Sequence, residues 1–287
     1  MVGAAAGRAV PVPSTALIAL ARASHPGPTL VVSTLTAVLV AAVGHSLLSG
    51  VAVTTAVFTG QLSIGWSNDW LDRNRDAATA RRDKPVARGE LPAPLVLRAA
   101  VLALAACVPL SLCTGIGPGV LHLGAVASAW AYNLGLKATP ASVLPYAVSF
   151  GLLPAYIVAA APGAGAAPGW MVAAGALLGA GAHFANGLPD LDDDLATGVH
   201  GLGHRLGRAG CATAAAVLLL AATALLAAGP PGPPSPAGLA VVGVAIVAGA
   251  TGLLAGRRPG SRAPFAAVLV IALSPVALLV ASGTSLS

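Results

Sequence analysis

Long apolar segments alternate with short polar or glycine- and proline-rich breaks along the whole chain. A helix that crosses a bilayer needs about 18 or more mostly apolar residues, and nine segments reach that length. The pattern therefore predicts an all-α, polytopic membrane protein with about nine transmembrane helices. The predicted helices span residues 28–48, 50–68, 93–113, 118–136, 141–161, 168–187, 209–229, 237–256 and 264–282.

The breaks between these segments have the composition of turns rather than of linkers between domains. Glycine- and proline-rich turns occupy residues 115–119, 162–169 and 229–236. We find no repeat at the periods of solenoid proteins, so we expect a single membrane-embedded domain over residues 1–287. Residues 1–27 lack the features of a signal peptide, and we expect them to form an N-terminal interfacial segment with a short helix over residues 14–23.

The positions of the basic residues predict the orientation of this bundle. With nine helices, every lysine and arginine falls on one side of the bilayer, and the four opposite loops carry none. By the positive-inside rule that side is cytoplasmic, with the N-terminus inside and the C-terminus outside. A pI near 9.9 does not indicate a nucleic-acid partner, because the basic residues are not gathered into one binding face.

Acidic residues are rare in the chain and form two clusters. Only 8% of the residues are charged, about a third of the share in a soluble domain. All nine acidic residues follow the second or the sixth predicted helix, on the predicted cytoplasmic side. Ionisable groups at the edge of membrane helices are candidates for function. The first cluster comprises Asp69, Asp72, Asp76, Asp83 and Glu90, and the second comprises Asp190, Asp192, Asp193 and Asp194.

The spacing within the clusters predicts a metal site. Asn68, Asp72 and Asp76 recur at every fourth position, so they share one face if the second helix continues past residue 68. Asp190 and Asp194 have the same spacing. Carboxylates stacked in this way repel each other, so we expect a counter-cation. Hard carboxylate and amide oxygens suit Mg²⁺, which commonly bridges to phosphates, so two facing helix ends are predicted to hold a diphosphate through Mg²⁺.

Lysine and aromatic residues are scarce and unevenly placed. The only two lysines, Lys84 and Lys137, lie at predicted cytoplasmic helix ends, where a point charge can bind phosphate. A positive-inside anchor is the alternative for Lys137. Aromatic residues concentrate in predicted helices 2, 4, 5 and 6, which predicts a chamber for a prenyl chain and its carbocation. A membrane-interface belt is the alternative for the tryptophans. The expected chamber residues are Phe58, Trp66, Trp130, Tyr146, Phe150 and Phe184.

Four short motifs carry a resemblance to a known family. "NDWLDRNRD" (68–76) resembles the NDxxDxxxD motif, and "DLDDD" (190–194) the DxxxD motif, of the UbiA superfamily of intramembrane prenyltransferases. "YNLGLK" (132–137) is similar to the tyrosine–lysine segment at the end of that family's fourth helix. "KPVARG" (84–89) is similar to its RPLxxG stretch. The resemblance covers nearly the whole chain and implies a UbiA-type bundle of nine helices with a central cavity.

The resemblance also implies roles for individual residues. It implies that Mg²⁺ holds the diphosphate of an isoprenyl donor, that cationic side chains neutralise the departing pyrophosphate, and that an electron-rich acceptor captures the allylic cation. The implied metal ligands are Asn68, Asp69, Asp72, Asp76, Asp190 and Asp194. The implied diphosphate-binding residues are Asn68, Lys84, Arg88 and Lys137. The implied catalytic residues are Asp72, Asp76, Asp190, Asp194, Lys137 and Tyr132.

Two departures from the family pattern leave the acceptor open. Gly187 stands where many members have an acid at the start of the second motif, and Ala138 follows Lys137 where many have a second basic residue. The expected reaction is transfer to an aromatic or quinone-type lipophilic acceptor. A membrane-bound terpene cyclase, which needs no acceptor, uses nearly the same motifs and is the alternative. A cation transporter is less favoured, because its acids would lie near mid-membrane. The arginine-, alanine- and glycine-rich composition suggests a bacterial plasma membrane.

Overall fold

The computed structural model describes residues 13–79, 81, 84–163, 165–189, 191, 198–255 and 270–271. Every regular element within these residues is a helix. The helices are α1 (Pro13–Ala23), α2 (Pro26–Ala42), α3 (Leu47–Ala78), α4 (Ala93–Leu112), α5 (Ile116–Leu134), the 3₁₀ turn η1 (Leu136–Ala138), α6 (Leu144–Ala159), α7 (Gly169–Gly187), α9 (Leu202–Ala228) and α10 (Pro236–Ala255).

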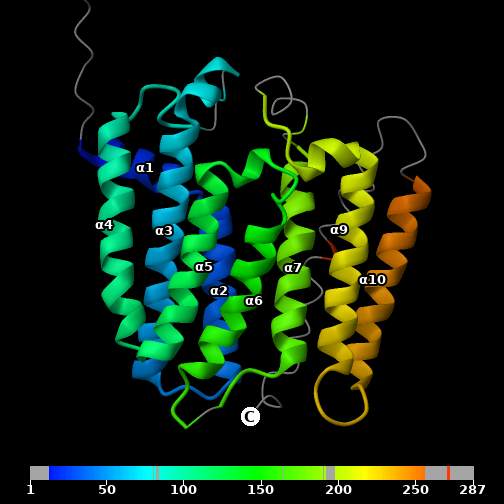
Figure 1. Cartoon of the computed structure of the whole chain (residues 1–287). Coiled ribbons are helices and arrows are strands. Elements are labelled where there is room, and N and C mark those ends of the chain that lie inside the picture. Colours follow the sequence, from blue (N-terminus) through cyan, green and yellow to red (C-terminus); the bar gives the residue numbers. More distant parts are fainter. Residues whose placement is uncertain are drawn as a thin grey trace, which may run out of the picture.

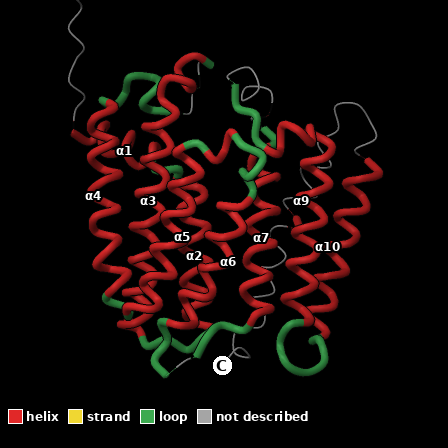
Figure 2. Tube along the Cα trace, viewed as in Figure 1, coloured by secondary structure: helices red, strands yellow, loops and turns green. Residues whose placement is uncertain are grey.

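Helices α2 to α10 stand side by side in a bundle, and successive helices run in opposite directions (Figures 1 and 2). The most extensive helix contacts join α3 to α4, α7 to α9 and α6 to α7. α1 is set apart from this arrangement, because its axis makes an angle of 68° with that of α2. The connections at one end of the bundle are short, and those at the other end are longer and polar. This alternation is the one that the breaks in the sequence predict.

Each of the first eight predicted membrane segments corresponds to one helix, and the short helix predicted over 14–23 corresponds to α1. By length and composition, α3, α4 and α9 are long and apolar enough to cross a membrane, and the bent pair α1 and α2 adds a fourth candidate. The ninth predicted segment, 264–282, lies outside the described residues except for Val270 and Ile271. The count of nine membrane crossings therefore stays a prediction.

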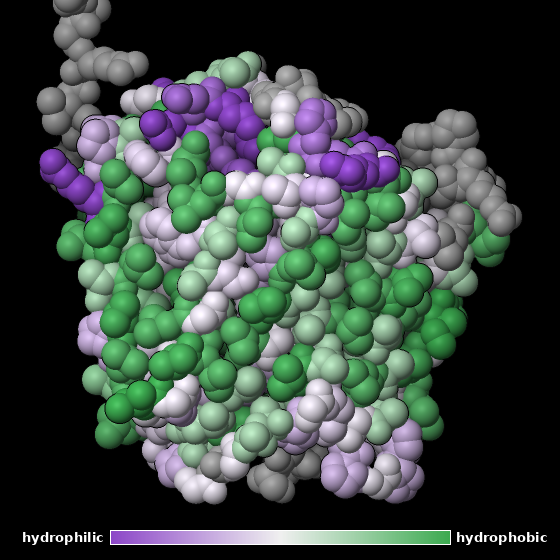
Figure 3. Space-filling view, viewed as in Figure 1, coloured by the Kyte–Doolittle hydropathy of each residue, from purple (hydrophilic) through white to green (hydrophobic). Residues whose placement is uncertain are grey.

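Polar side chains gather on one end of the bundle, and its sides are apolar (Figure 3). Large apolar residues point outward from α3, α4 and α10; Leu102 is 69% exposed and Val247 is 63% exposed. In a soluble protein an apolar surface of this extent would favour association. Contact with lipid acyl chains covers these apolar side chains and removes the tendency to associate. The outer surface therefore agrees with the membrane class that the sequence predicts.

Two helix boundaries differ from the sequence prediction, and both differences affect the polar end. α3 continues to Ala78, ten residues past the predicted end at residue 68, because the polar segment 69–78 contains no glycine or proline that would stop a helix. α9 begins at Leu202 rather than at residue 209. It is interrupted at Gly207, whose φ of 68° is accessible mainly to glycine.

Small residues allow helices that line the interior to approach closely. A Cβ atom placed on Gly179 of α7 would lie 2.6 Å from Cβ of Phe150 in α6 and would also collide with the backbone oxygen of Tyr146. Close approach of this kind is how helices associate inside a membrane, where apolar burial gives little driving force. Gly179 therefore sets the separation of α6 and α7.

Glycine also brings the α1–α2 turn against α3. A Cβ atom on Gly65 would overlap the backbone of Ser24. The indole Nε1 of Trp66 donates a hydrogen bond of 2.8 Å to the backbone oxygen of Leu20, which ties α1 to the same part of α3. His25, in the turn, adopts a left-handed conformation with φ 55°. The docked turn places His25 beside the polar end of α3.

We predict that Gly179→Ala destabilises the protein, because its methyl group meets the α6 backbone. Overpacking of this kind costs about 1–3 kcal/mol, which lowers the melting temperature measured in detergent by several degrees. Gly243→Ala in α10 is the matched control, because no atom lies within 4 Å of the added Cβ. Equal melting temperatures for the two variants would contradict the close α6–α7 contact.

Candidate active site

A cavity of about 470 Å³ lies inside the bundle and extends from its polar end into its apolar interior. The lining residues come from the α1–α2 turn, from α2, α3, α5, η1, α6, α7 and α9, and from the segments that follow α3, η1 and α7. This volume is within the range of binding sites for small organic ligands. The charged side chains of the lining all lie toward the polar end; they are Asp72, Arg75, Asp76, Arg81, Lys84 and Lys137.

The long α3 helix presents the first acidic motif to this cavity. Because α3 continues to Ala78, Asn68, Asp72 and Asp76 follow one another at successive turns of one helix face. All three line the cavity, and both carboxylates are buried. The sequence spacing therefore places these oxygens together, as expected.

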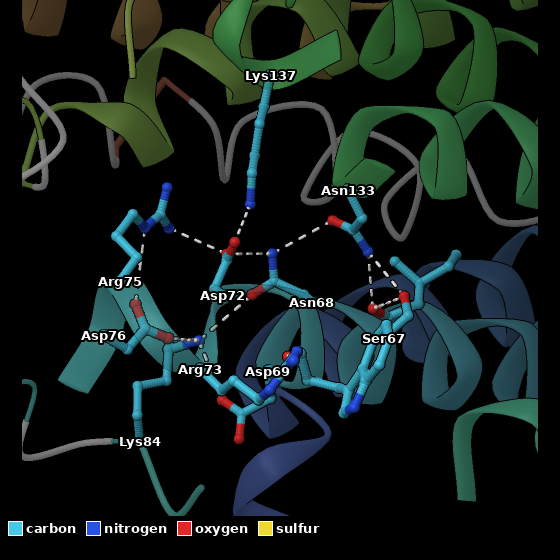
Figure 4. A network of polar contacts seen from close by, with 12 residues as sticks. Ser67, Asn68, Asp69, Asp72, Arg73, Arg75, Asp76, Lys84, Asn133 and Lys137 are labelled. Atoms are coloured by element: carbon cyan, nitrogen blue, oxygen red, sulfur yellow. Dashed lines mark hydrogen bonds and ion pairs between the residues drawn. The ribbon is translucent and has the colours of Figure 1, made fainter. Parts of the chain in front are cut away.

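A cationic side chain from the far side of the cavity meets Asp72. Lys137 lies in η1, just after α5, and its Nζ forms an ion pair with Asp72 Oδ1 (Figure 4). The second carboxylate oxygen, Asp72 Oδ2, accepts hydrogen bonds from Arg75 at 2.9 Å and from Asn68 Nδ2 at 3.1 Å. Asp72 is thus the point at which α3 and η1 are joined.

Asn133 extends this network into the helix packing. Its Oδ1 accepts a hydrogen bond of 3.2 Å from Asn68 Nδ2. Its Nδ2 donates to Ser67 Oγ at 2.9 Å and to the backbone oxygen of Ile64 at 3.0 Å. These bonds fix the Asn68 amide so that its Oδ1 faces away from Asp72. The orientation of Asn68 follows from its partner on α5.

Lys84 occupies the other side of the motif. Its Nζ lies 3.3 Å from Asn68 Oδ1, 3.3 Å from Asp69 Oδ1 and 3.9 Å from Asp76 Oδ2. A fourth contact, of 2.8 Å, joins it to His25 Nε2 in the α1–α2 turn. Because the ammonium group has no lone pair, Lys84 donates this hydrogen bond and His25 Nε2 accepts it. A buried lysine therefore sits between two buried carboxylates.

The donor atoms of this motif suit Mg²⁺. They are amide and carboxylate oxygens, the hard ligands that Mg²⁺ prefers. Asp76 Oδ2 is buried and accepts no hydrogen bond from the described residues. Within those residues, no three His, Cys, Asp or Glu side chains converge tightly enough to hold a metal by themselves. The other predicted ligands, Asp190 and Asp194, lie outside the described residues.

Aromatic rings form the wall next to the charged end. Tyr132 and Tyr146 meet edge to face with centroids 5.2 Å apart, and Phe150 stacks on Tyr146 at 6.3 Å. His183 lies 5.2 Å from Tyr146 and 5.1 Å from Phe184, and its Nε2 is 3.1 Å from Ser142 Oγ. These rings line the same cavity as the charged groups, so ring faces and edges are available to a ligand bound there.

Three of the six aromatic residues predicted for the chamber lie elsewhere. Trp66 packs against α1 through its bond to Leu20, and Phe58 is 39% exposed; both line a shallow outer groove between α1, α2 and α3. Trp130 is not among the lining residues, and its Nε1 donates to Ser63 Oγ at 3.2 Å. These three residues lie on the predicted helices, but the rotation of each helix about its axis turns their rings away from the cavity.

Two of the predicted polar residues are also displaced from the cavity. Arg88 has a half-exposed side chain and pairs with Glu90 at 2.7 Å, so it does not line the cavity. Asp69 is fully buried and faces Lys84 from the adjacent side of α3. The predicted binding roles of these residues stay predictions. Asp69 is excluded from the cavity because the helix face that lines it carries every fourth residue from Asn68, whereas Arg88 lies in the turn between α3 and α4.

The structure also brings residues to the site that the sequence did not single out. Arg75 and Asn133 contact side chains of the first motif directly. Both lie inside sequence motifs that the resemblance identified, so their positions in those motifs could have marked them as site residues. His25 and His183 come from segments with no such motif. Their contribution depends on the α1–α2 turn and on the pairing of α7 with the loop after η1, which local spacing does not reveal.

The arrangement as a whole matches known proteins. The model of the UbiA prenyltransferase family matches residues 29–273. A UbiA homolog from Archaeoglobus fulgidus bound to GPP and Mg²⁺ superposes with a TM-score of 0.69 at 16% identity, covering 92% of this chain and 98% of that one. A structure of digeranylgeranylglyceryl phosphate synthase gives a TM-score of 0.67 at 15% identity, covering 93% and 99%.

A UbiA homolog from Aeropyrum pernix K1, solved without ligand, gives a TM-score of 0.63 at 20% identity, covering 93% of this chain and 98% of that one. No curated protein matches the sequence significantly. At these identities the structures show a shared fold, whereas the family match extends over most of the chain. The chain therefore belongs to the UbiA prenyltransferase family.

Proposed function

We propose that this protein transfers an isoprenyl group from an isoprenyl diphosphate to an aromatic or quinone-type lipophilic acceptor, in a Mg²⁺-dependent reaction. The observation that carries the proposal is the composition of one cavity. Its polar end holds Asn68, Asp72 and Asp76 together with Lys84 and Lys137, and its continuation is lined mainly by aromatic and aliphatic side chains. A diphosphate needs the polar end, and the donor's hydrocarbon chain and a lipophilic acceptor need an apolar space next to it.

The donor end is supported by the chemistry of its side chains and by the relatives. Two structures of the Archaeoglobus fulgidus homolog hold Mg²⁺, one with GPP and the other with DMAPP. In this chain, Asn68, Asp72 and Asp76 supply oxygen ligands suited to that ion, and Asp190 and Asp194 are proposed to complete the set. When bound, Mg²⁺ neutralises the diphosphate and stabilises it as a leaving group.

The cationic residues then act on the departing charge. Lys137 pairs with Asp72, Arg75 pairs with Asp72 and Asp76, and Lys84 pairs with Asp69 and Asp76. A diphosphate that engages the metal provides these cations with new oxygen partners at the same place. Preorganised charges of this kind stabilise the transition state without reorganising solvent. Tyr132 and Tyr146 line the same cavity and present ring faces or edges to the space where an allylic cation forms.

The apolar helices and the family indicate an integral membrane protein. We propose that it crosses the bilayer nine times, in a bacterial plasma membrane, with both acidic motifs on the cytoplasmic side. The gathering of polar side chains at one end of the bundle supports this orientation (Figure 3). A water-soluble diphosphate and a lipid-soluble acceptor then reach the cavity from different phases.

We predict that Asp72→Asn and Asp76→Asn each lower pyrophosphate release from geranyl diphosphate and Mg²⁺ by about 100-fold or more, because each removes a charged ligand. The assay uses the full chain in lipid nanodiscs with phenolic acceptors present. Glu90→Gln is the matched control, because Glu90 is acidic and nearby yet pairs with Arg22 and Arg88 outside the cavity. Full activity in both Asp variants, with normal folding, would contradict the site.

We also predict that release of pyrophosphate depends on an added phenolic or quinol-type acceptor and that the product carries the prenyl group on that acceptor. The measurement is product analysis by mass spectrometry with geranyl and farnesyl diphosphate, with and without acceptor. A cyclic hydrocarbon or alcohol formed at the same rate without acceptor would replace transfer by intramolecular cyclisation. Asp72→Asn provides the background for both reactions.

A further inference from the structure

Apart from Ser149, whose hydroxyl donates to the backbone oxygen of Ala125, the inner part of the cavity contains two polar side chains that the reaction described above does not use. They are Gln61 on α3 and His122 on α5, and both line the cavity. Their neighbours in the lining are aliphatic, including Val57, Val126 and Leu153. Polar groups in an apolar interior are costly unless they find a hydrogen-bond partner, so each requires an explanation.

The hydrogen bonds around His122 determine which of its nitrogens carries the proton. Ser111 Oγ donates to the backbone oxygen of Cys107 at 2.6 Å, the usual bond of a helical serine to the preceding turn. Its single proton is then used, so the contact of 2.8 Å between Ser111 Oγ and His122 Nδ1 has Nδ1–H as donor. Nε2 of the neutral ring therefore carries a lone pair and accepts hydrogen bonds.

The packing of the His122 ring covers one face, Nδ1 and Cε1. One face of the His122 ring stacks on Tyr156, with centroids 4.7 Å apart and an interplanar angle of 17°. Nδ1 is covered by Ser111, and Cε1 lies 3.4 Å from the position of a Cβ atom on Gly60. His122 lines the cavity, so we infer that the remaining edge, Nε2 and Cδ2, faces it. No protein group in the described chain donates to Nε2.

Gln61 adds a second polar group at a similar depth. It follows Gly60, which touches His122, and it precedes Asn68 by seven residues, so it shares the cavity-facing side of α3. Its side-chain amide makes no hydrogen bond with the described residues. An amide both donates and accepts, so Gln61 can donate to an oxygen whose own proton is given to His122 Nε2.

We propose that His122 Nε2 and Gln61 form a subsite for the hydroxyl group of an uncharged aromatic acceptor. This inference rests on the proposed transfer to a lipophilic acceptor. The charged lining residues all lie at the other end, so the subsite favours a neutral ligand over an ion. Seven residues of helix separate Gln61 from Asn68, about 10 Å along the cavity. An acceptor of two fused rings, with its hydroxyl inward, fits this separation and points its far ring toward the diphosphate end.

A matched pair of ligands tests the hydroxyl requirement. The probes are 2-naphthol and 2-methoxynaphthalene, which have the same ring system but differ in the O–H donor. Their equilibrium binding is measured on the full chain in lipid nanodiscs, with empty nanodiscs as the reference for partitioning. We expect 2-naphthol to bind the protein about tenfold or more tightly than the ether, because a buried acceptor left unpaired costs about that much.

Variants assign the preference to this subsite. His122→Phe keeps a ring to stack on Tyr156 and removes Nε2, and Gln61→Leu keeps the side-chain volume. Each is expected to reduce 2-naphthol binding by about tenfold while leaving the ether unchanged. His45→Phe is the control, because His45 is a histidine outside the cavity that bonds the backbone oxygen of Ile157. Because the probe pair is also compared on the wild-type chain, a variant that fails to fold does not remove the test.

Equal binding of the two probes to the wild-type chain, or binding of neither, would overturn the subsite and mean that His122 and Gln61 contact only water. So would a naphthol preference that persists in both variants. The binding assay contains no diphosphate and no Mg²⁺, so its outcome is separate from that of the proposed reaction. Pyrophosphate release that survives Asp72→Asn would refute the function, whereas equal probe binding would refute only the subsite.

Discussion

The central constraint on this molecule is the burial of ionised groups at the edge of an apolar bundle. Asp69, Asp72 and Asp76 are almost fully removed from solvent. An unpaired buried carboxylate costs several kcal/mol or more, so it persists only beside a cation and hydrogen-bond donors. Lys84, Lys137 and Arg75 meet that requirement, and they come from three different segments. The ion pairs thereby decide where η1 and the loop after α3 lie.

Close helix contacts make this convergence possible. Lys137 reaches Asp72 only because α5 packs near α3, and Lys84 meets His25 only because Gly65 lets the α1–α2 turn lie on the α3 backbone. Without a strong apolar driving force inside a membrane, glycine contacts and interhelical hydrogen bonds such as Asn68 to Asn133 carry more of the association. The same residues that join the helices therefore also orient the polar groups of the site.

The sequence predicted the parts of this structure that depend on local periodicity. Apolar segment lengths located eight helices, and the four-residue spacing of Asn68, Asp72 and Asp76 placed them on one face. The sequence did not predict features that depend on the rotation of a helix about its own axis. Phe58 and Trp130 lie on the expected helices yet point away from the cavity, because an apolar helix in lipid has no polar face to reveal its orientation.

The sequence also did not predict contacts between segments that are distant along the chain. The bond between Ser111 and His122 crosses from α4 to α5, and His25 approaches Lys84 from 59 residues away. Each histidine looks isolated in the sequence because its partner is an ordinary serine or lysine in another segment. Conversely, the scarcity of lysine drew attention to Lys84 and Lys137, and the resemblance supported both through their flanking motifs, whereas local chemistry left a membrane anchor as the alternative for Lys137.

The charges of the buried network also bear on what enters the cavity. Its three carboxylates, Asp69, Asp72 and Asp76, face four cations, Arg75, Arg81, Lys84 and Lys137, so 4 − 3 leaves a net charge of +1. A single net positive charge does not balance a highly charged diphosphate by itself. A diphosphate that arrives with a divalent cation gives the carboxylates a new partner and the lysines new oxygens, so the pairs exchange without leaving a buried charge uncompensated. The network favours the complex of ion and diphosphate over either component alone.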